Sequence, residues 1–382
     1  MATVFLLIIY LAFISLGLPD SLLGVNWYLI HLDFNVSTEA LGIFTMTIAL
    51  GTITSSFISG YLIRRFRTGL LTFLSTLLTA LALLGMAFAP SIIWFWLLAI
   101  PLGLGAGAVD VALNNYVANY YKSRHMNWLH CFWGVGAMAG PLIMGFMLEE
   151  HTWRDGYLLI ALIQFALVLV LLISLPFWKK TEPKAETKAS KPTNIKLISI
   201  KGVKLALIAF AFYTATEAAL SSWGSTYLIH ARNLTPSTAA IWVATFYGGI
   251  TIGRFLVGII SNKVGNKLLI RLGQLTALIG VLLLILPLPH ILVLIGFILI
   301  GLGCAPIFPS MLHETPARFG SNISQVLIGF QMGFAYIGST FLPPLMGLIA
   351  SNTSMHLIPY FVLGFIIIMF ISSEVLNKIK NN

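Results

Sequence analysis

The stretch WKKTEPKAETKASKPTNIKLISIKGVK, residues 178–204, divides an otherwise apolar chain into two halves of similar length. It contains eight lysines against two glutamates, with prolines at positions 183 and 192. A segment of this composition buries too little apolar surface to fold by itself, so we predict a flexible basic linker over residues 178–203. Residues 1–177 and 204–382 then form an N-terminal and a C-terminal half.

Both halves have the composition of a protein embedded in lipid. Of the 382 residues, 58% are hydrophobic and only 9% are charged, whereas a soluble domain carries roughly 25% charged residues. Because about 20 apolar residues span a bilayer, we expect an all-α membrane protein with about twelve transmembrane helices, six in each half. The expected windows are residues 3–31, 37–63, 69–89, 91–121, 127–148, 157–177, 204–229, 236–260, 267–288, 290–312, 320–350 and 355–377.

The distribution of basic residues predicts the orientation in the membrane. Lysine and arginine gather in the loops on one side of this topology, and positive loops face the cytoplasm. That side holds the linker lysines together with Arg64, Arg65, Arg67, Lys122, Arg124, Lys263, Lys267, Arg271, Arg318, Lys378 and Lys380. The opposite side shows only Arg154 and Arg232. We therefore expect a multi-pass protein of the cell membrane (a plasma or inner membrane), with both termini and the linker in the cytoplasm.

The two halves carry traces of an internal repeat. Residues 60–67, after the second window, are echoed by residues 258–267 after the eighth, at an offset of 198 positions. The same offset carries Asp20 in the first window to within one residue of Glu217 in the seventh. Repeats of this kind place two similar halves about a pseudo-twofold axis along the membrane normal.

These loop residues resemble the signature G-x-x-x-D-R-x-G-R-K that follows the second helix in the major facilitator superfamily. The second copy keeps Gly258, Lys263, Gly265 and Lys267, with Asn262 in place of the acid. The first copy keeps Gly60 and Arg65 but has Arg64 in place of the acid and Arg67 in place of the later glycine. The resemblance covers essentially the whole chain, and it implies a transporter fold that lacks the family's usual acid-mediated cytoplasmic latch.

Within that superfamily the chain resembles the fucose permease and sodium-dependent glucose transporter-like group. The residues that carry this resemblance are Leu18-Pro19-Asp20, Gly105-x-Gly107-x-x-Asp110-x-x-x-Asn114, Asn127-x-x-His130-x-Phe132, Gly136-x-x-x-Gly140-Pro141, Glu217-x-x-x-x-x-Trp223-x-x-Thr226-Tyr227, Gly248-Gly249-x-Thr251-x-Gly253-Arg254 and Pro306-Ile-Phe-Pro309. In fucose permease-like proteins, acids on the first and fourth helices serve sugar recognition and proton coupling. The resemblance assigns these roles to Asp20 and Asp110.

Three acids lie well inside the expected spans: Asp20, Asp110 and Glu217. An ionised carboxylate at a helix centre costs roughly 2.5 to 3.5 kcal/mol to insert, so such a group faces a watery cavity or takes up a proton. The deepest cation, Arg254, lies about a turn and a half from the loop, and we interpret it as a side chain that snorkels to the surface. We predict cation coupling through the three acids, with hydrogen bonding between helices as the structural alternative.

The candidate substrate residues combine polar groups with aromatic rings, as a sugar requires for its hydroxyls and its C–H faces. Asp110 and Asn114 share one helix face because they are four residues apart, and His130 and Trp133 lie three apart. The full predicted set is Asp20, Asn114, His130, Trp133, Trp223 and Gln331. For each tryptophan, helix packing or an interfacial position is the alternative.

These patterns favour a secondary transporter that imports a sugar or similar small polar solute by alternating access, in symport with a proton or sodium ion. The sequence contains no Walker motif, no Cys/His metal cluster and no Ser/His/Asp spacing, so we expect neither an enzyme nor a cofactor or metal. The alternatives are a proton-coupled exporter of drugs or lipids, suggested by residues 136–141, and a non-transporting membrane sensor. We expect a functional monomer in the bilayer that binds no nucleic acid.

Overall fold

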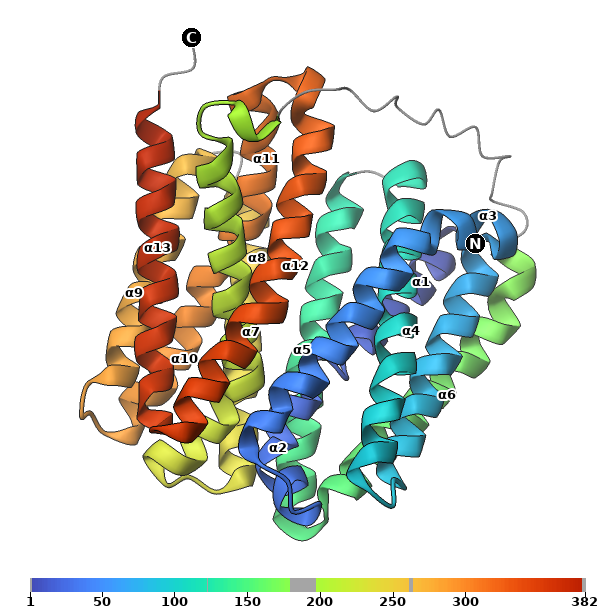
Figure 1. Cartoon of the computed structure of the whole chain (residues 1–382). Helices are drawn as coiled ribbons and strands as arrows, with labels where there is room; N and C mark the ends of the chain where they lie inside the picture. The colour runs from blue at the N-terminus through green and yellow to red at the C-terminus, as the bar shows by residue number, and fades with distance from the viewer. Residues whose placement is uncertain (1, 122, 179–196, 261–263, 380–382) are drawn as a thin grey trace. The chain divides into compact units, whose positions relative to one another are not determined.

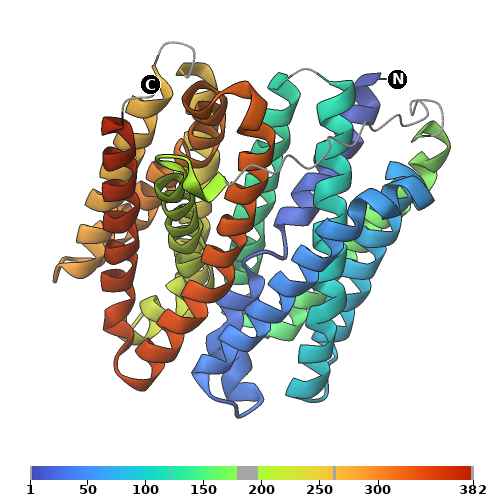
Figure 2. The same cartoon turned by 45° about the horizontal axis from the view of Figure 1, so that its top comes forward.

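The computed structural model describes residues 2–121, 123–178, 197–260 and 264–379. All regular structure in these residues is helical, as Figures 1 and 2 show. The α-helices are α1 (Ala2–Gly17), α2 (Leu22–Asp33), α3 (Leu41–Ala87), α4 (Ile92–Tyr120), α5 (Ser123–Glu150), α6 (Trp153–Trp178), α7 (Val203–Arg232), α8 (Pro236–Ile260), α9 (Asn266–Ile285), α10 (His290–Cys304), α11 (Ile307–Phe319), α12 (Ser321–Asn352) and α13 (Ile358–Lys378). Short 3₁₀ turns cover Thr38–Ala40 (η1), Leu197–Ser199 (η2) and Met355–Leu357 (η3).

The described residues contain twelve stretches that are long and apolar enough to cross a membrane, which confirms the predicted number of spans. Two of these spans are interrupted. The first consists of α1 and α2, separated at residues 18–21, and the tenth consists of α10 and α11, separated at Ala305 and Pro306. Proline has no N–H to donate and clashes with the preceding turn, so Pro19 and Pro306 account for the two breaks. Figure 2 shows the interruption in the blue ribbon of the first span.

The described chain divides into two compact units. Of the described residues, the first unit contains 2–22, 32–36, 44–121 and 123–178, and the second contains 23–31, 37–43, 197–260 and 264–379. Most of α2 therefore groups with the C-terminal helices. The Ser225 hydroxyl on α7 donates to the Val25 carbonyl at 3.0 Å, and a side chain at Gly24 would overlap the Ser221 carbonyl. Of the expected linker, residues 179–196 lie outside the described part, and the described chain already forms η2 at Leu197–Ser199.

In the first unit, α1 lies close against α5. A Cβ built on Gly136 would overlap the Ile14 carbonyl oxygen, and one built on Gly17 would overlap the Trp133 carbonyl oxygen. Glycine is therefore required at both positions of this crossing. A reciprocal pair joins α1 to α6: Ser15 donates to the Gln164 side chain at 2.7 Å, and Gln164 donates to the Ser15 carbonyl at 2.6 Å.

In the second unit, α7 packs against α12 and α13, and the three ribbons run side by side in both views. The Thr214 hydroxyl on α7 donates to the Ala335 carbonyl on α12 at 2.7 Å. The α8 and α10 helices also approach closely, because a Cβ on Gly301 would overlap the Phe246 carbonyl oxygen. Glycines and short hydroxyl side chains thus set the helix spacing in a solvent where burial of apolar surface gives little driving force.

The second and third spans lie in α3, which consists of two helices that meet at a kink at Arg67. Arg67 has φ 64° and ψ 161°, a backbone region that is occupied almost only by glycine. It stands where the family signature has its later glycine. In the second copy that position is Gly265, whose φ of −63° is available to any residue. The departure from the signature at Arg67 therefore places an arginine on strained backbone.

We expect Arg67→Gly to relieve this strain and stabilise the protein by about 1 kcal/mol or more, because such conformations cost roughly 1–3 kcal/mol. The measurement is the Tm of the detergent-solubilised protein. Gly265→Ala is the matched control, since Gly265 has a negative φ and no atoms near an added Cβ. An unchanged or lower Tm for Arg67→Gly would contradict the assignment of strain.

Candidate functional site

The polar site of the first unit begins at the break in the first span. Residues 18–21 leave the helix, and Asp20 lies exposed on this turn, where its N–H donates to the Gly17 carbonyl at 3.2 Å. The neighbouring Ser21 hydroxyl donates to the Ala137 carbonyl on α5 at 3.4 Å, which ties the turn to that helix. The first span is thus distorted around Pro19, and the distortion presents a carboxylate.

Trp133 holds this carboxylate in place. Its indole Nε1–H donates to Asp20 Oδ2 at 2.7 Å. The two residues were predicted separately as substrate ligands, and the structure brings them together from α5 and the α1–α2 turn. The aromatic face and the carboxylate therefore lie side by side.

A second polar pair lies on α4. Asn114 Nδ2 donates to Asp110 Oδ1 at 2.8 Å and to the Asp110 carbonyl oxygen at 3.0 Å, across one helical turn. Both side chains are partly exposed. The shared helix face predicted from their spacing is confirmed. The Asn114 side chain can bond Asp110 in either protonation state. Its NH₂ group donates to the carboxylate, and its oxygen can accept from the protonated acid.

His130 lies on α5, partly exposed, with its ring edge toward Phe13 at a centroid distance of 6.0 Å. It is thus placed on the α1–α5 side of the first unit, together with Trp133. This unit contains acids in its spans but no basic counterpart at depth. The sequence has no lysine or arginine between positions 68 and 121, or among the first 63 residues.

Glu217 lies at the middle of α7 in the second unit. Tyr213, one turn earlier, donates its hydroxyl to Glu217 Oε2 at 2.7 Å. Arg254 on α8 places Nη2 4.0 Å from Glu217 Oε1. The interpretation of Arg254 as a snorkelling side chain is therefore wrong: it forms an ion pair inside the spans. No local sequence pattern could have predicted this pair, because the two residues lie on different helices and 37 positions apart.

Two predicted substrate residues lie in the packing of the second unit. Trp223 is fully buried, and its indole contacts α12 where a Cβ on Gly347 would overlap the ring. Gln331 is 2% exposed and accepts a hydrogen bond from the Thr315 hydroxyl at 3.0 Å. Each side chain thus has a structural position between helices, away from an open surface, and we leave both out of the binding set.

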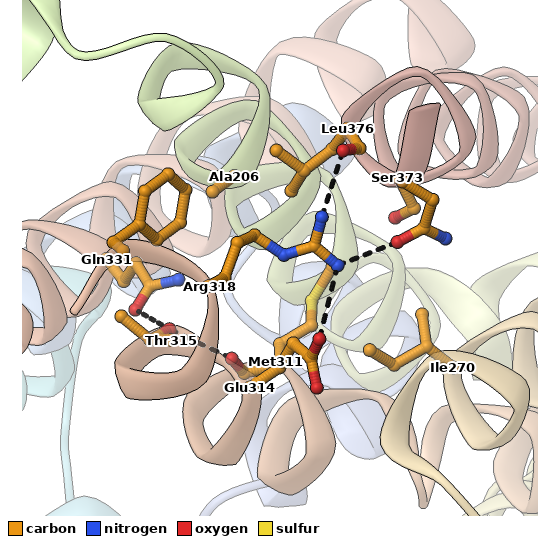
Figure 3. A pocket seen from close by; sticks show the side chains of 11 residues that line it. Ala206, Ile270, Met311, Glu314, Thr315, Arg318, Gln331, Ser373 and Leu376 are labelled. Atoms are coloured by element: carbon orange, nitrogen blue, oxygen red, sulfur yellow. Dashed lines mark hydrogen bonds and ion pairs between the residues drawn. The ribbon is translucent and has the colours of Figure 1, made fainter. Parts of the chain in front are cut away.

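Gln331 borders a small pocket between α7, α9, α11, α12 and α13, shown in Figure 3. Arg318 crosses it and donates to the Leu376 carbonyl at 2.9 Å and to Asn377 Oδ1 at 2.7 Å, with Glu314 Oε1 3.5 Å from its guanidinium. The volume of this cavity is about 30 Å³. That is room for one or two water molecules and not for a sugar. The pocket therefore belongs to the polar network that fastens α11 to α13.

The whole chain was then compared with known proteins. A sequence model described as the Major Facilitator Superfamily matches residues 9–230 and 205–376. The chain belongs to this superfamily. Its members and the relatives below are transporters, so the protein is a multi-pass membrane transporter and not an enzyme.

Two curated relatives of this superfamily member are named for different substrates. The cis,cis-muconate transport protein of Acinetobacter baylyi is 23% identical, over 96% of this chain and 93% of the relative. The glucose/mannose transporter GlcP of Bacillus subtilis is 26% identical, over 73% of this chain and 77% of the relative. A solved D-xylose-proton symporter has a TM-score of 0.80 at 13% identity, with 98% and 97% of the two chains covered. That structural likeness shows the major facilitator fold.

We expect Gln331→Ala to destabilise this transporter without changing its affinity for substrate. The substitution removes a buried side chain and the hydrogen bond that it accepts from the Thr315 hydroxyl, which costs roughly 1 kcal/mol, while that hydroxyl can still donate to the Met311 carbonyl at 3.0 Å. The Tm in detergent and the apparent KM for uptake separate the two effects. Asn352→Ala, at the exposed end of α12, is a control that should change neither quantity. A raised KM with an unchanged Tm would return Gln331 to the binding set.

Proposed function

We propose that the protein imports a neutral sugar or similar small polar solute by alternating access, with a proton or sodium ion as the coupling ion. One observation carries this proposal: the carboxylate of Asp20, on an unwound turn of the first span, accepts the indole N–H of Trp133 at 2.7 Å. Backbone leaves a helix at membrane depth only where it is buried in protein or lines a watery cavity. The turn is therefore a suitable place for a polar ligand.

The chemistry of this pair suits a sugar. A carboxylate accepts hydrogen bonds from two or more hydroxyl groups. The face of an indole ring stacks on the apolar C–H face of a pyranose. Asn114 and His130 add a donor and an acceptor from α4 and α5. Asp20, Trp133, Asn114 and His130 are thus the proposed substrate residues.

Charge favours a neutral substrate over an anionic one. The spans of the first unit carry Asp20 and Asp110 with no lysine or arginine at similar depth. A dicarboxylate such as muconate needs cationic partners in a membrane site, because an unpaired charge there is costly. The glucose/mannose transporter therefore provides the nearer analogy for the substrate class, and the muconate relative provides the second candidate.

We assign the coupling role to Asp110. A carboxylic acid in the middle of α4 can be neutral when the site is dry and ionised when water or a polar ligand reaches it. Asn114 hydrogen-bonds the carboxyl and keeps it in place. Binding of the ion and binding of the solute then affect each other's affinity, as symport requires. Glu217 already has Arg254 as a partner, so it is the less suitable coupling residue.

The drug-exporter alternative was based on the glycine and proline motif at residues 136–141, and the structure gives this motif a packing role. Gly136 and Gly140 lie where α5 meets α1, and an added Cβ would overlap the carbonyl oxygens of Ile14 and Leu18. Close packing therefore accounts for that motif. The proposal includes a monomer in the plasma or inner membrane. The basic loops support an orientation with both termini and the linker in the cytoplasm.

Asp110→Asn and Asp20→Asn should have different effects on transport in proteoliposomes without ATP. Asp110→Asn removes the titratable proton, so we expect sugar exchange to persist while accumulation driven by a pH or sodium gradient falls at least tenfold. Asp20→Asn removes the proposed sugar acceptor and should raise the KM roughly tenfold, the equivalent of about 1.4 kcal/mol. A panel of glucose, galactose and mannose is the probe. Gradient-driven accumulation by Asp110→Asn would contradict the coupling role.

Trp133→Phe keeps an aromatic face but removes the N–H that holds Asp20. We expect a roughly two- to tenfold higher KM for the sugar, because an intramolecular hydrogen bond contributes roughly 0.5–1.5 kcal/mol net. Trp128→Phe on the same helix is the matched control, since Trp128 is 45% exposed and has its ring beside His125. Equal effects of the two substitutions on KM would exclude the assigned role of Trp133.

A further inference from the structure

The break in the first span deprives one backbone carbonyl of its helical donor. In a continuous helix the Ser15 carbonyl would accept the N–H of residue 19, as the Ile14 carbonyl accepts the N–H of Leu18 at 3.1 Å. Residue 19 is a proline, which has no N–H and whose ring clashes with the carbonyl four residues earlier. Because the bilayer core offers no water to such a group, another part of the protein has to supply the donor.

Gln164 on α6 supplies this donor. Its Nε2 donates to the Ser15 carbonyl at 2.6 Å, and its Oε1 accepts the Ser15 hydroxyl at 2.7 Å, so both polar atoms of the amide are bonded. Gln164 is 1% exposed and is the one polar residue between Tyr157 and Ser174 in the sequence. Its span has an 18-residue window with a mean hydropathy of 3.0, the highest among the twelve spans of the described residues. A buried amide in so apolar a helix is costly unless it is bonded, which points to a specific task for this side chain.

A second proline creates the same need on α5. Pro141 lies inside that helix, so the Ala137 carbonyl, four residues earlier, cannot accept an N–H from position 141. The hydroxyl of Ser21, the residue after Asp20, donates to this carbonyl at 3.4 Å. This bond is longer than those of Gln164 and therefore weaker. The carbonyls that the two prolines deprive of a donor are thus both bonded by side chains at or beside the turn.

We propose that Gln164 and Ser21 are positioning residues for solute binding, because they replace the N–H groups that the two prolines lack and so hold the turn that carries Asp20. Gln164 bonds the chain five residues before Asp20, and Ser21 directly follows it, so the turn is tied on both sides. All of these residues lie in the first unit, together with Trp133. Asp20 is exposed whereas Gln164 and Ser21 are buried, so the two act on a solute through the carboxylate. This inference rests on the proposed binding of a sugar at Asp20 and adds the residues that fix its geometry.

Gln164→Leu removes the donor and keeps the approximate volume of the side chain. We expect the KM for sugar uptake in proteoliposomes, measured with glucose, galactose and mannose, to rise roughly fivefold while the maximal rate stays within about twofold. Ser174→Ala is the matched control, because it removes another buried hydrogen bond on α6, the one that Trp178 donates to Ser174 at 3.1 Å. This control should leave the KM unchanged.

A positioning effect and a merely structural effect differ in how they combine with loss of the carboxylate. Asp20→Asn weakens the acceptor that the turn presents, so Gln164→Leu should raise the KM less than about twofold in that background. An equal rise in both backgrounds would show that Gln164 acts elsewhere and overturns the inference, as does an unchanged KM in Gln164→Leu. Where Gln164→Leu does not fold, Ser21→Ala is measured in the same way. Its expected rise is roughly two- to fivefold, because its bond is the weaker one, and an unchanged KM overturns the inference equally.

Hydrogen exchange tests the hold on the turn without any solute. The amides of Asp20 and Leu22 donate to carbonyls within the turn, so their exchange in detergent reports its opening. We expect roughly tenfold faster exchange in Gln164→Leu and no change in Ser174→Ala. Pro19→Ala restores the missing N–H, so Gln164→Leu should accelerate exchange less than about threefold in that background.

The two measurements separate this inference from the proposed function. Equal exchange in the wild type and in Gln164→Leu overturns the inference, whichever solute the protein carries. Sugar uptake by the wild type together with an unchanged KM in Gln164→Leu overturns the positioning role alone. If the wild type takes up none of the three sugars, the proposed function fails, and the exchange comparison still decides whether Gln164 holds the turn.

Discussion

A backbone surrounded by lipid must satisfy its hydrogen bonds within the protein, and this constraint accounts for most of the structure. It restricts the described spans to helices and limits interruptions to places where other groups take over. At the α1–α2 turn, Asp20 N–H bonds back to Gly17 and the Ser21 hydroxyl reaches the Ala137 carbonyl. The interruption is therefore stable, and it carries an acid that an uninterrupted helix would have to bury.

The same constraint explains why small residues dominate the helix contacts. Lipid chains are as apolar as leucine, so the helices gain stability from close approach and not from hiding their surface. Gly136 against Ile14 and Gly301 against Phe246 bring backbones together in the two units. Hydroxyl and amide groups then join neighbouring helices, as Gln164 joins Ser15 and Thr214 joins Ala335. These contacts hold the acids in defined positions.

The two units differ in how they handle charge. In the first, Asp20 and Asp110 accept hydrogen bonds from neutral donors, Trp133 and Asn114. In the second, Glu217 is opposed by the cationic Arg254. These three acids of the spans therefore have neutral partners in one unit and a cationic partner in the other.

The sequence alone determined the class of protein, the number of spans and the helix faces within one span. Apolar runs of about 20 residues, the proline at position 19 and the four-residue spacing of Asp110 and Asn114 are local properties that the chain carries wherever it folds. Only the tertiary structure decided which side chains meet across helices. It paired Asp20 with Trp133 and Glu217 with Arg254, and it placed Trp223 and Gln331 in the packing, because contacts between spans depend on helix rotation and crossing. The hydropathy of a single segment encodes neither the rotation of a helix nor its crossing with its neighbours. Lipid accepts an apolar helix in any rotation about its axis.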